Sequence, residues 1–433
     1  MTDHFENSMT PKEIVDYLDQ HIIGQGAAKK AVAIALRNRW RRLNLLPEFD
    51  HLKEDIIPKN ILMMGSTGIG KTEIARRIAK MTDAPFVKVE ATKFTEIGYV
   101  GRDVEQIIRD LMEEALILVR RKMRQKYTAL SQRIAMKQVA TVLKKRKEYS
   151  DKSEEDIIHM IKAGELDHEI IEVSESKDFV VGDLVSFQNF FKDLDIEKSI
   201  DTKMPLPRAL EYYAEKEADR YVNEGEVIIQ AKKSVEKSGI VFIDEIDKIC
   251  TGSHITHKQS DVSREGVQRD LLPIIEGTTV STKYGIIKTD HILFIGAGAF
   301  HMSKPTDLIP ELQGRFPIKV ELQELSKEEL IKILTVPKSS ILAQGKAMIA
   351  SEGITLDFTE DALDFISEYA VAHNKIINIG ARRLFTVMEN VLEDIYFDPK
   401  ATTDAGNLTI DKAFVEKKLG ALPEHQELSR FML

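Results

Sequence analysis

One short stretch of the chain combines glycines, a lysine and a hydroxyl in a spacing that suits phosphate binding. Residues 65–72 fit the pattern G-x-x-x-x-G-K-[ST]. Glycines let successive backbone N–H groups turn toward one anion, and a helix that starts directly afterwards adds unpaired N–H groups and its positive dipole end. The residues of this phosphate loop are Gly65, Ser66, Thr67, Gly68, Ile69, Gly70, Lys71 and Thr72. The pattern predicts a site for ATP or GTP, in which Lys71 reaches the β- and γ-phosphates and the Thr72 hydroxyl ligates Mg²⁺.

The residues on either side of the loop have the patterns of a strand and a helix. Residues 61–64 form a short apolar run that is typical of a buried strand. After the loop, Ile74 and Ile78 are spaced four apart, which predicts an amphipathic helix. A chance match to the loop pattern in a chain of this length has odds of about one in a hundred. With the strand and the helix in place, an accidental glycine-rich turn is a poor alternative.

Two carboxylates follow another apolar run. Residues 240–243 are four consecutive strand formers, and Asp244 and Glu245 come directly after them. Alone, such a pair would be read as acids at the surface end of a strand. Together with Lys71 we interpret Asp244 as the holder of the Mg²⁺ shell and Glu245 as the group that polarises the attacking water, because phosphoryl transfer depends on an oriented nucleophile. Residues 291–296 predict the next core strand.

Composition and charge restrict the class of protein. The chain has 433 residues, 43% hydrophobic and 30% charged, which predicts two to four globular domains. A net charge of −9 does not favour nucleic acid or an anionic membrane as a partner. The single cysteine, Cys250, excludes an internal disulfide framework and a four-cysteine zinc site. Because there is no signal-peptide core and no apolar run of about 18 residues, we expect a cytoplasmic protein without a membrane span.

The organisation of the chain follows from where these patterns stop and resume. We interpret residues 110–233, with long polar helical stretches, as a helical insertion domain whose basic runs are solvated helix faces. The insertion would interrupt an α/β nucleotide-binding domain of residues 1–109 and 234–325, with a parallel sheet flanked by helices. Ser326 and Glu329 have the spacing of a capping box and would open a smaller, mostly helical C-terminal domain of residues 326–433.

Two arginines next to glycines are candidates for sensing phosphate. Arg315 follows Gly314, and Arg382 comes two residues after Gly380. Guanidinium groups neutralise the charge that develops during phosphoryl transfer. From spacing alone, solvated surface arginines are the simpler interpretation of both.

Several stretches, taken together, resemble the HslU (ClpY) family of AAA+ protein unfoldases. These stretches are residues 21–25, 33–42, 90–101, 262–273 and 428–433. The resemblance covers both flanks almost entirely and is weak across the insertion, which is a variable helical domain in this family. It implies a homohexameric ring that hydrolyses ATP with Mg²⁺ and pulls unfolded or tagged protein chains through its centre. It also implies a separate HslV-type peptidase as the partner.

The resemblance assigns roles to individual residues. Ile23 would pack on the adenine, Arg315 would be the finger that reaches the neighbouring subunit's ATP, and Arg382 would read the nucleotide from the smaller domain. Further contacts at the nucleotide site are implied for Glu73, Glu311 and Arg383.

Two segments outside the nucleotide site are assigned in the same way. The loop that lines the pore would consist of Gly98, Tyr99, Val100 and Gly101. An aromatic ring on a glycine-flanked loop can grip a passing chain through sequence-tolerant apolar contact. The tail that docks on the peptidase would end in Phe431, Met432 and Leu433, which offer an apolar anchor and a terminal carboxylate.

One departure and three alternatives stay open. Many related ATPases place a polar side chain after the strand at residues 293–295, where this chain has Gly296, Ala297 and Gly298, so we assign no separate sensor residue there. A ClpX-like unfoldase is the alternative within the class, although the lone cysteine and the long insertion argue against it. A AAA+ nucleic-acid motor would predict basic residues at the pore instead of Tyr99 and Val100. A nucleotide-switched scaffold would bind without turnover.

Overall fold

The computed structural model describes residues 9–53, 55–56, 59–94, 103–174, 201–250, 258–399 and 406–420. The chain divides into two compact units, one formed by Met1–Ala115 with Lys232–Leu433 and the other by Leu116–Ala231. None of the helices in the described ranges is long and apolar enough to cross a membrane.

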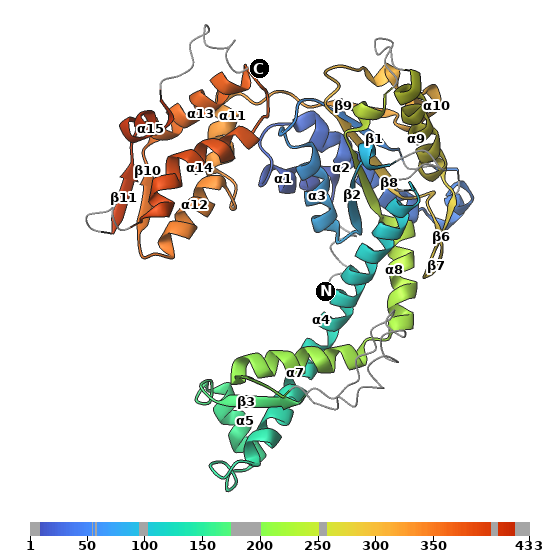
Figure 1. Cartoon of the computed structure of the whole chain (residues 1–433). Helices are drawn as coiled ribbons and strands as arrows, with labels where there is room; N and C mark the ends of the chain where they lie inside the picture. The colour runs from blue at the N-terminus through green and yellow to red at the C-terminus, as the bar shows by residue number, and fades with distance from the viewer. Residues whose placement is uncertain are drawn as a thin grey trace. The chain divides into compact units, whose positions relative to one another are not determined.

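A five-stranded parallel sheet is formed within residues 61–321 of the first unit (Figure 1). In spatial order its strands are β2 (Phe86–Glu90), β5 (Ile240–Asp244), β8 (Leu293–Gly298), β1 (Ile61–Met64) and β9 (Ile318–Glu321). Neighbouring strands are parallel throughout, so their carboxyl ends meet at one edge, where open α/β sheets bind ligands. The central strands β5 and β8 are almost wholly buried, which explains their continuous apolar sequences. The predicted α/β fold with a parallel sheet is confirmed.

Helices cover the sheet and close its core. They are α1 (Pro11–Asp19), α2 (Gly26–Leu43), α3 (Lys71–Thr82), α9 (Lys258–Glu276), α10 (Pro310–Arg315), and the parts of α4 (Gln106–Lys144) and α8 (Glu224–Ser238) that belong to this unit. Ile74 and Ile78 of α3 are fully buried in one apolar cluster with Leu18 of α1 and Val32 of α2. A capping box starts α1, in which Thr10 N–H donates to Glu13 Oε2 over 2.6 Å.

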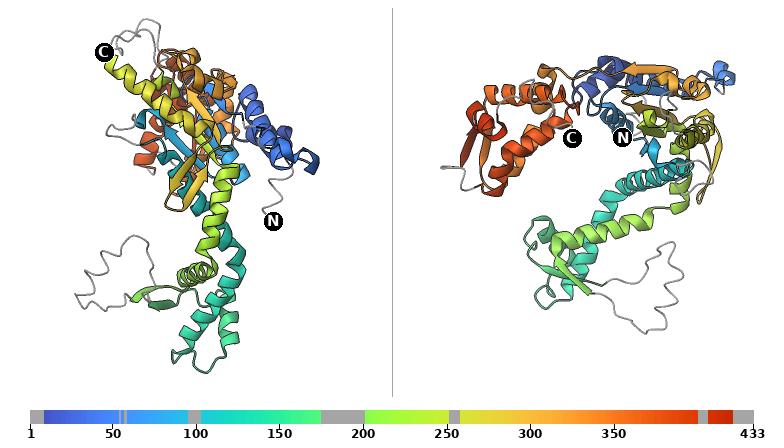
Figure 2. Two further views of the ribbon diagram at one scale, coloured as in Figure 1. Left: turned by 90° about the vertical axis from the view of Figure 1, so that its right-hand side faces the viewer. Right: turned by 45° about the horizontal axis from the view of Figure 1, so that its top comes forward.

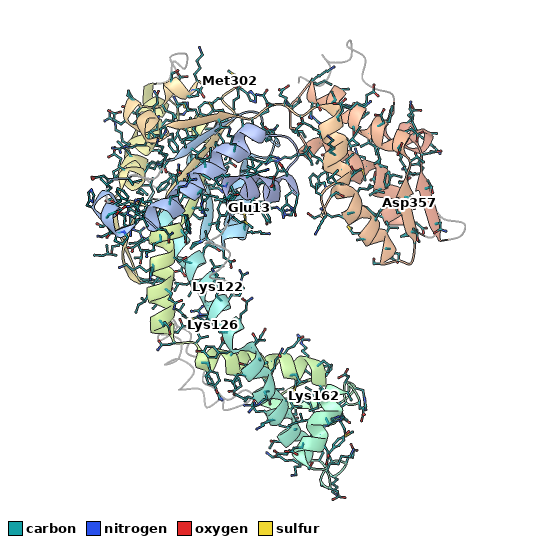
Figure 3. The ribbon with its side chains drawn as sticks, turned by 180° about the vertical axis from the view of Figure 1, so that it is seen from behind. Glu13, Lys122, Lys126, Lys162, Met302 and Asp357 are labelled. Carbon is teal, nitrogen blue, oxygen red and sulfur yellow. The ribbon has the colours of Figure 1, made fainter. Side chains whose placement is uncertain are left out.

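Short elements connect these layers. They are the 3₁₀ turns η2 (Pro47–Leu52), η3 (Ala91–Lys93), η4 (Ile246–Ile249) and η5 (Pro305–Asp307), and an antiparallel hairpin of β6 (Thr279–Thr282) and β7 (Gly285–Lys288). The loop between β8 and η5 carries Met302, which is 96% exposed (Figure 3).

The C-terminal part of the first unit has an apolar cluster of its own. Its elements are α11 (Lys327–Thr335), α12 (Ile341–Ala350), β10 (Thr355–Phe358), α13 (Glu360–Asn374), α14 (Arg382–Phe397), β11 (Asn407–Ile410) and α15 (Lys412–Leu419). Ser326 caps α11 with Glu329, as its sequence predicts. The parallel pair β10–β11 lies beside α12 (Figure 1).

The second unit combines helices with one strand pair. It holds most of α4, α5 (Glu154–Lys162), β3 (Ile170–Ser174), β4 (Asp201–Pro205), α7 (Leu206–Tyr221) and the start of α8. The antiparallel pair β3–β4 is not predicted by the sequence, and α7 packs against both strands (Figure 2).

Part of the basic run on α4 is matched by acids within this second unit. Arg120 donates to Glu224 over 2.8 Å, and Arg124 pairs with Asp219. Other lysines, such as Lys126 on α4 and Lys162 on α5, are exposed (Figure 3). Both patterns agree with solvated helix faces.

Candidate nucleotide-binding site

The phosphate loop joins the end of β1 to the start of α3 at the carboxyl edge of the sheet. Gly65, Gly68 and Gly70 have φ angles of +134°, +73° and +106°, a region that L side chains rarely adopt. Gly65 N–H also donates to the carbonyl of Gly298 over 3.2 Å, which ties the loop to the end of β8. The strand, the loop and the helix therefore stand in the order that turns backbone N–H groups toward an anion.

Lys71 is held at the base of this loop. Its ammonium donates to the carbonyl of Ser66 over 2.6 Å and to that of Gly65, and the residue is 8% exposed. Burial lowers the pKa of Lys71, while Asp244 and Asp247 act in the opposite direction. The structure thus brings the predicted cation and the predicted carboxylate into one electrostatic environment.

Asp244 and Glu245 end the neighbouring strand β5. Asp244 Oδ2 lies 2.8 Å from the ammonium of Lys88 on β2, a partner that the sequence analysis does not identify. Glu245 has a φ of +56°, which is uncommon for a non-glycine residue, and its N–H donates to Asp244 Oδ1 over 3.1 Å. Such left-handed backbone clusters at functional sites. At Glu245 this backbone conformation ends the extended strand, and the Glu245 side chain is exposed.

Asp247 lies beside the last residue of β8, Gly298. A Cβ on Gly298 would lie 2.7 Å from Asp247 Oδ1, and Asp247 Oδ2 accepts from Phe300 N–H over 3.3 Å. The carboxylate of Asp247 therefore occupies the space that a side chain at position 298 would need. The sequence signal for this arrangement is the glycine itself.

The start of α14 meets the phosphate loop from the C-terminal part of the unit. Ala381 N–H donates to the carbonyl of Gly68 over 3.0 Å, and a Cβ on Gly68 would lie 3.3 Å from Arg382 Cγ. Arg382 also contributes to the lowered pKa of Lys71, after burial. The arrangement supports the predicted role of Arg382.

The loop expected to contact the adenine is fixed beside the phosphate loop. Ile22 is buried, and its Cγ2 would lie 3.7 Å from a Cβ on Gly70, whereas Ile23 is half-buried. The Gln25 side chain pairs with the main chain of Gln323 in both directions, donating over 2.8 Å and accepting over 3.0 Å. These contacts hold the backbone around Ile23 in place and leave part of its side chain accessible.

Three predicted site residues contact groups other than the phosphate loop, and a fourth is exposed. Glu73 pairs with Arg77 over 2.6 Å and with Arg76 over 3.3 Å. Arg315 pairs with Glu276 of α9 over 2.8 Å. Arg383 donates to the carbonyl of Ile377 over 2.8 Å, and Glu311 is exposed on α10. The roles of these residues stay predictions.

Two predicted segments lie outside the described residues. They are the pore-loop residues Gly98, Tyr99, Val100 and Gly101 and the tail residues Phe431, Met432 and Leu433.

The strand order, the phosphate loop and the acidic end of β5 define a P-loop ATPase domain. Residues 61–175 match the ATPase family associated with various cellular activities (AAA), and residues 170–319 match an AAA domain of the Cdc48 subfamily. The chain is also 48% identical over 448 aligned residues to the ATP-dependent protease ATPase subunit HslU of Persephonella marina, covering 98% of this chain and 99% of that protein. The chain therefore belongs to the HslU family. The predicted family and the predicted ATPase activity are confirmed.

Proposed function

We propose that this chain couples the hydrolysis of MgATP to the unfolding of proteins and passes them, as a homohexameric ring, to an HslV-type peptidase. The P. marina relative is by its name the ATPase subunit of an ATP-dependent protease, and the two chains align almost end to end. One observation of the structure carries the proposal: Lys71, Asp244 and Arg382 gather at a single phosphate loop. A cytoplasmic location without membrane or nucleic-acid partners is part of the proposal.

The phosphate loop would hold the triphosphate through its N–H groups and the start of α3. Lys71 would exchange the carbonyls of Gly65 and Ser66 for phosphate oxygens, which carry more negative charge. Arg382 would add a second cation from the C-terminal part of the unit.

Thr72 and Asp244 are the residues that would hold Mg²⁺. Among the residues that the structure describes, no group of three or more His, Cys, Asp or Glu forms a metal site. This fits a cation that arrives with the nucleotide, because Mg²⁺ on a nucleotide takes most ligands from phosphate and water. Bound there, Mg²⁺ would neutralise charge on the phosphate oxygens. It would compete with Lys88 for Asp244.

Glu245 and Arg315 have separate proposed roles in ATP hydrolysis. The exposed carboxylate of Glu245 is free to orient a water molecule for attack. Arg315 lies against Glu276 and not at the phosphate loop of its own chain, which suits a finger for the ATP of a neighbouring subunit. Tyr99 would grip the substrate, and Leu433 with its two preceding residues would dock on the peptidase.

The test combines the purified chain with an HslV-type peptidase, fluorescently labelled casein and ATP. We expect degradation that requires hydrolysable ATP and that is lost in Lys71→Thr, which should no longer bind nucleotide. Deletion of residues 424–433 should abolish degradation but leave ATP hydrolysis measurable. ATP hydrolysis that is stimulated by DNA in a salt-sensitive manner, without degradation, would favour the nucleic-acid motor instead.

A further inference from the structure

The turn between α13 and α14 packs directly against the phosphate loop. Gly380 has a φ of +58°, and a Cβ there would lie 2.6 Å from the carbonyl oxygen of Thr67. A Cβ on Gly68 would collide with the carbonyl oxygen of Ile379. The two backbones approach so closely because glycine occupies both sides of the contact. We refer to residues 375–381 as the docking turn.

Asn378 makes the polar contacts at the centre of this docking turn. Its Nδ2 donates to Glu324 Oε1 over 2.8 Å and lies 3.4 Å from the Ser66 hydroxyl, to which it also donates. Its Oδ1 accepts from Gly380 N–H over 3.0 Å, and its carbonyl accepts from the Thr67 hydroxyl over 3.4 Å. One residue thus touches the phosphate loop, its own turn and Glu324.

Glu324 lies in the connector, residues 322–326, which joins β9 to α11. The same connector is paired with Gln25 through Gln323. Two amide side chains therefore hold the connector. Gln25 precedes the connector in the chain, and Asn378 follows it. If the C-terminal part of the unit rotates about the connector, Asn378 must lengthen its contact with Glu324, its contact with the phosphate loop, or both.

We propose that Asn378 is a positioning residue that sets the phosphate loop for ATP through its bond to Glu324. The inference rests on the proposed nucleotide site and extends it to a residue that contacts no phosphate. By holding the loop and the connector together, Asn378 makes ATP affinity depend on the placement of the C-terminal part of the unit.

The bond from Asn378 to Glu324 can be reversed by exchange of donor and acceptor. Asn378→Asp places two carboxylates in contact, and one of them must be protonated or move away. In the double variant Asn378→Asp with Glu324→Gln, the new amide at 324 donates to the new carboxylate at 378. Glu324→Gln alone keeps an acceptor oxygen for Asn378 and serves as the matched control.

The measurement is the KM for ATP and the kcat of the full chain. We expect Asn378→Asp to raise KM about fivefold, the scale of one ordinary hydrogen bond at an exposed site, with a smaller change in kcat. The control Glu324→Gln and the double variant should both lie within about twofold of the parent chain. The defect of Asn378→Asp should also shrink from pH 8 to pH 6, as the carboxylate pair takes up a proton.

Two further variants separate positioning from simple folding. Asn374, the last residue of α13, bonds the docking turn through Ile379 N–H and the Gly380 carbonyl and not through Glu324, so Glu324→Gln should not rescue Asn374→Asp. Glu324→Ala removes the acceptor at an exposed site, where folding is least affected, and should raise KM about threefold. An unchanged KM in Asn378→Asp and Glu324→Ala, or a double variant as poor as Asn378→Asp, would overturn the inference. If the double variant restores the KM for ATP but the parent chain supports no casein degradation, the result would count against the proposed function alone.

Discussion

Arg39 provides the most direct test of how the sheet is held together. Its guanidinium donates to the carbonyls of Lys237, Gly239 and His291 over 2.7, 3.1 and 2.5 Å, and the residue is 8% exposed. The first two carbonyls lie just before β5 and the third just before β8. One side chain of α2 thus fixes the starts of both central strands. Arg39→Met keeps the apolar stem and removes the donors of these three bonds.

The expected loss follows from the number of bonds. A hydrogen bond from a charged donor contributes about 1.5–3 kcal/mol, and water replaces part of it at accessible carbonyls. Three such bonds make the loss about 3–5 kcal/mol in the free energy of unfolding of the nucleotide-binding region. At about 2–4 °C per kcal/mol for a domain of 150–250 residues, the Tm should fall by about 10 °C. Arg39→Lys keeps the charge but not the fork of donors, so its loss should be intermediate.

The assay is thermal unfolding together with hydrogen exchange of peptides from β5 and β8. Exchange is needed because a chain with two compact units does not unfold as one two-state system. The control is Arg41→Met, since Arg41 is exposed and bonds the Asn38 side chain over 2.9 Å. We expect that control to change stability by no more than about 0.5 kcal/mol. Equal effects of Arg39→Met and Arg41→Met would refute the reasoning.

Three other outcomes are expected. Glu245→Gln should bind ATP normally and release phosphate about 10²-fold more slowly, because the water-orienting carboxylate is lost; unchanged turnover would remove its proposed role. Tyr99→Ala should lower the amount of casein unfolded per ATP hydrolysed by about tenfold, the scale of one lost aromatic contact, and an unchanged ratio would place the grip elsewhere. Burial raises the pKa of the Cys250 thiol to about 12. Only about 10⁻⁴ of this thiol is ionised at pH 8, so iodoacetamide should label the native chain far more slowly than the denatured one, and equal rates would contradict the buried placement.

The core strands could be predicted because their signal is local. Strands β1, β5 and β8 are continuous apolar runs, buried on both faces of a parallel sheet. The sequence does not predict the edge strand β9, because only Val320 of its four residues is buried. It does not predict strands β3 and β4 for another reason. They pair across 26 intervening residues, and no turn signal marks such a hairpin.

The same distinction applies to the site. The phosphate loop and Asp244 follow from short patterns with their own chemistry. Lys88 meets Asp244 because β2 and β5 are paired in register, although about 150 residues separate them in the chain. Asn378 meets Ser66 across 312 positions. Contacts of this kind have no local pattern, so only the fold reveals them.

The glycines of the phosphate loop allow both an unusual backbone conformation and a close packing contact. Positive φ angles at Gly65, Gly68 and Gly70 create the anion nest, and this need is visible in the sequence. At Gly68 the missing Cβ also admits the carbonyl of Ile379, and at Gly380 it admits the carbonyl of Thr67. The loop that would bind phosphate is therefore also one wall of the contact with the docking turn. Because the two backbones are packed in direct contact, any displacement of this loop would also displace the docking turn.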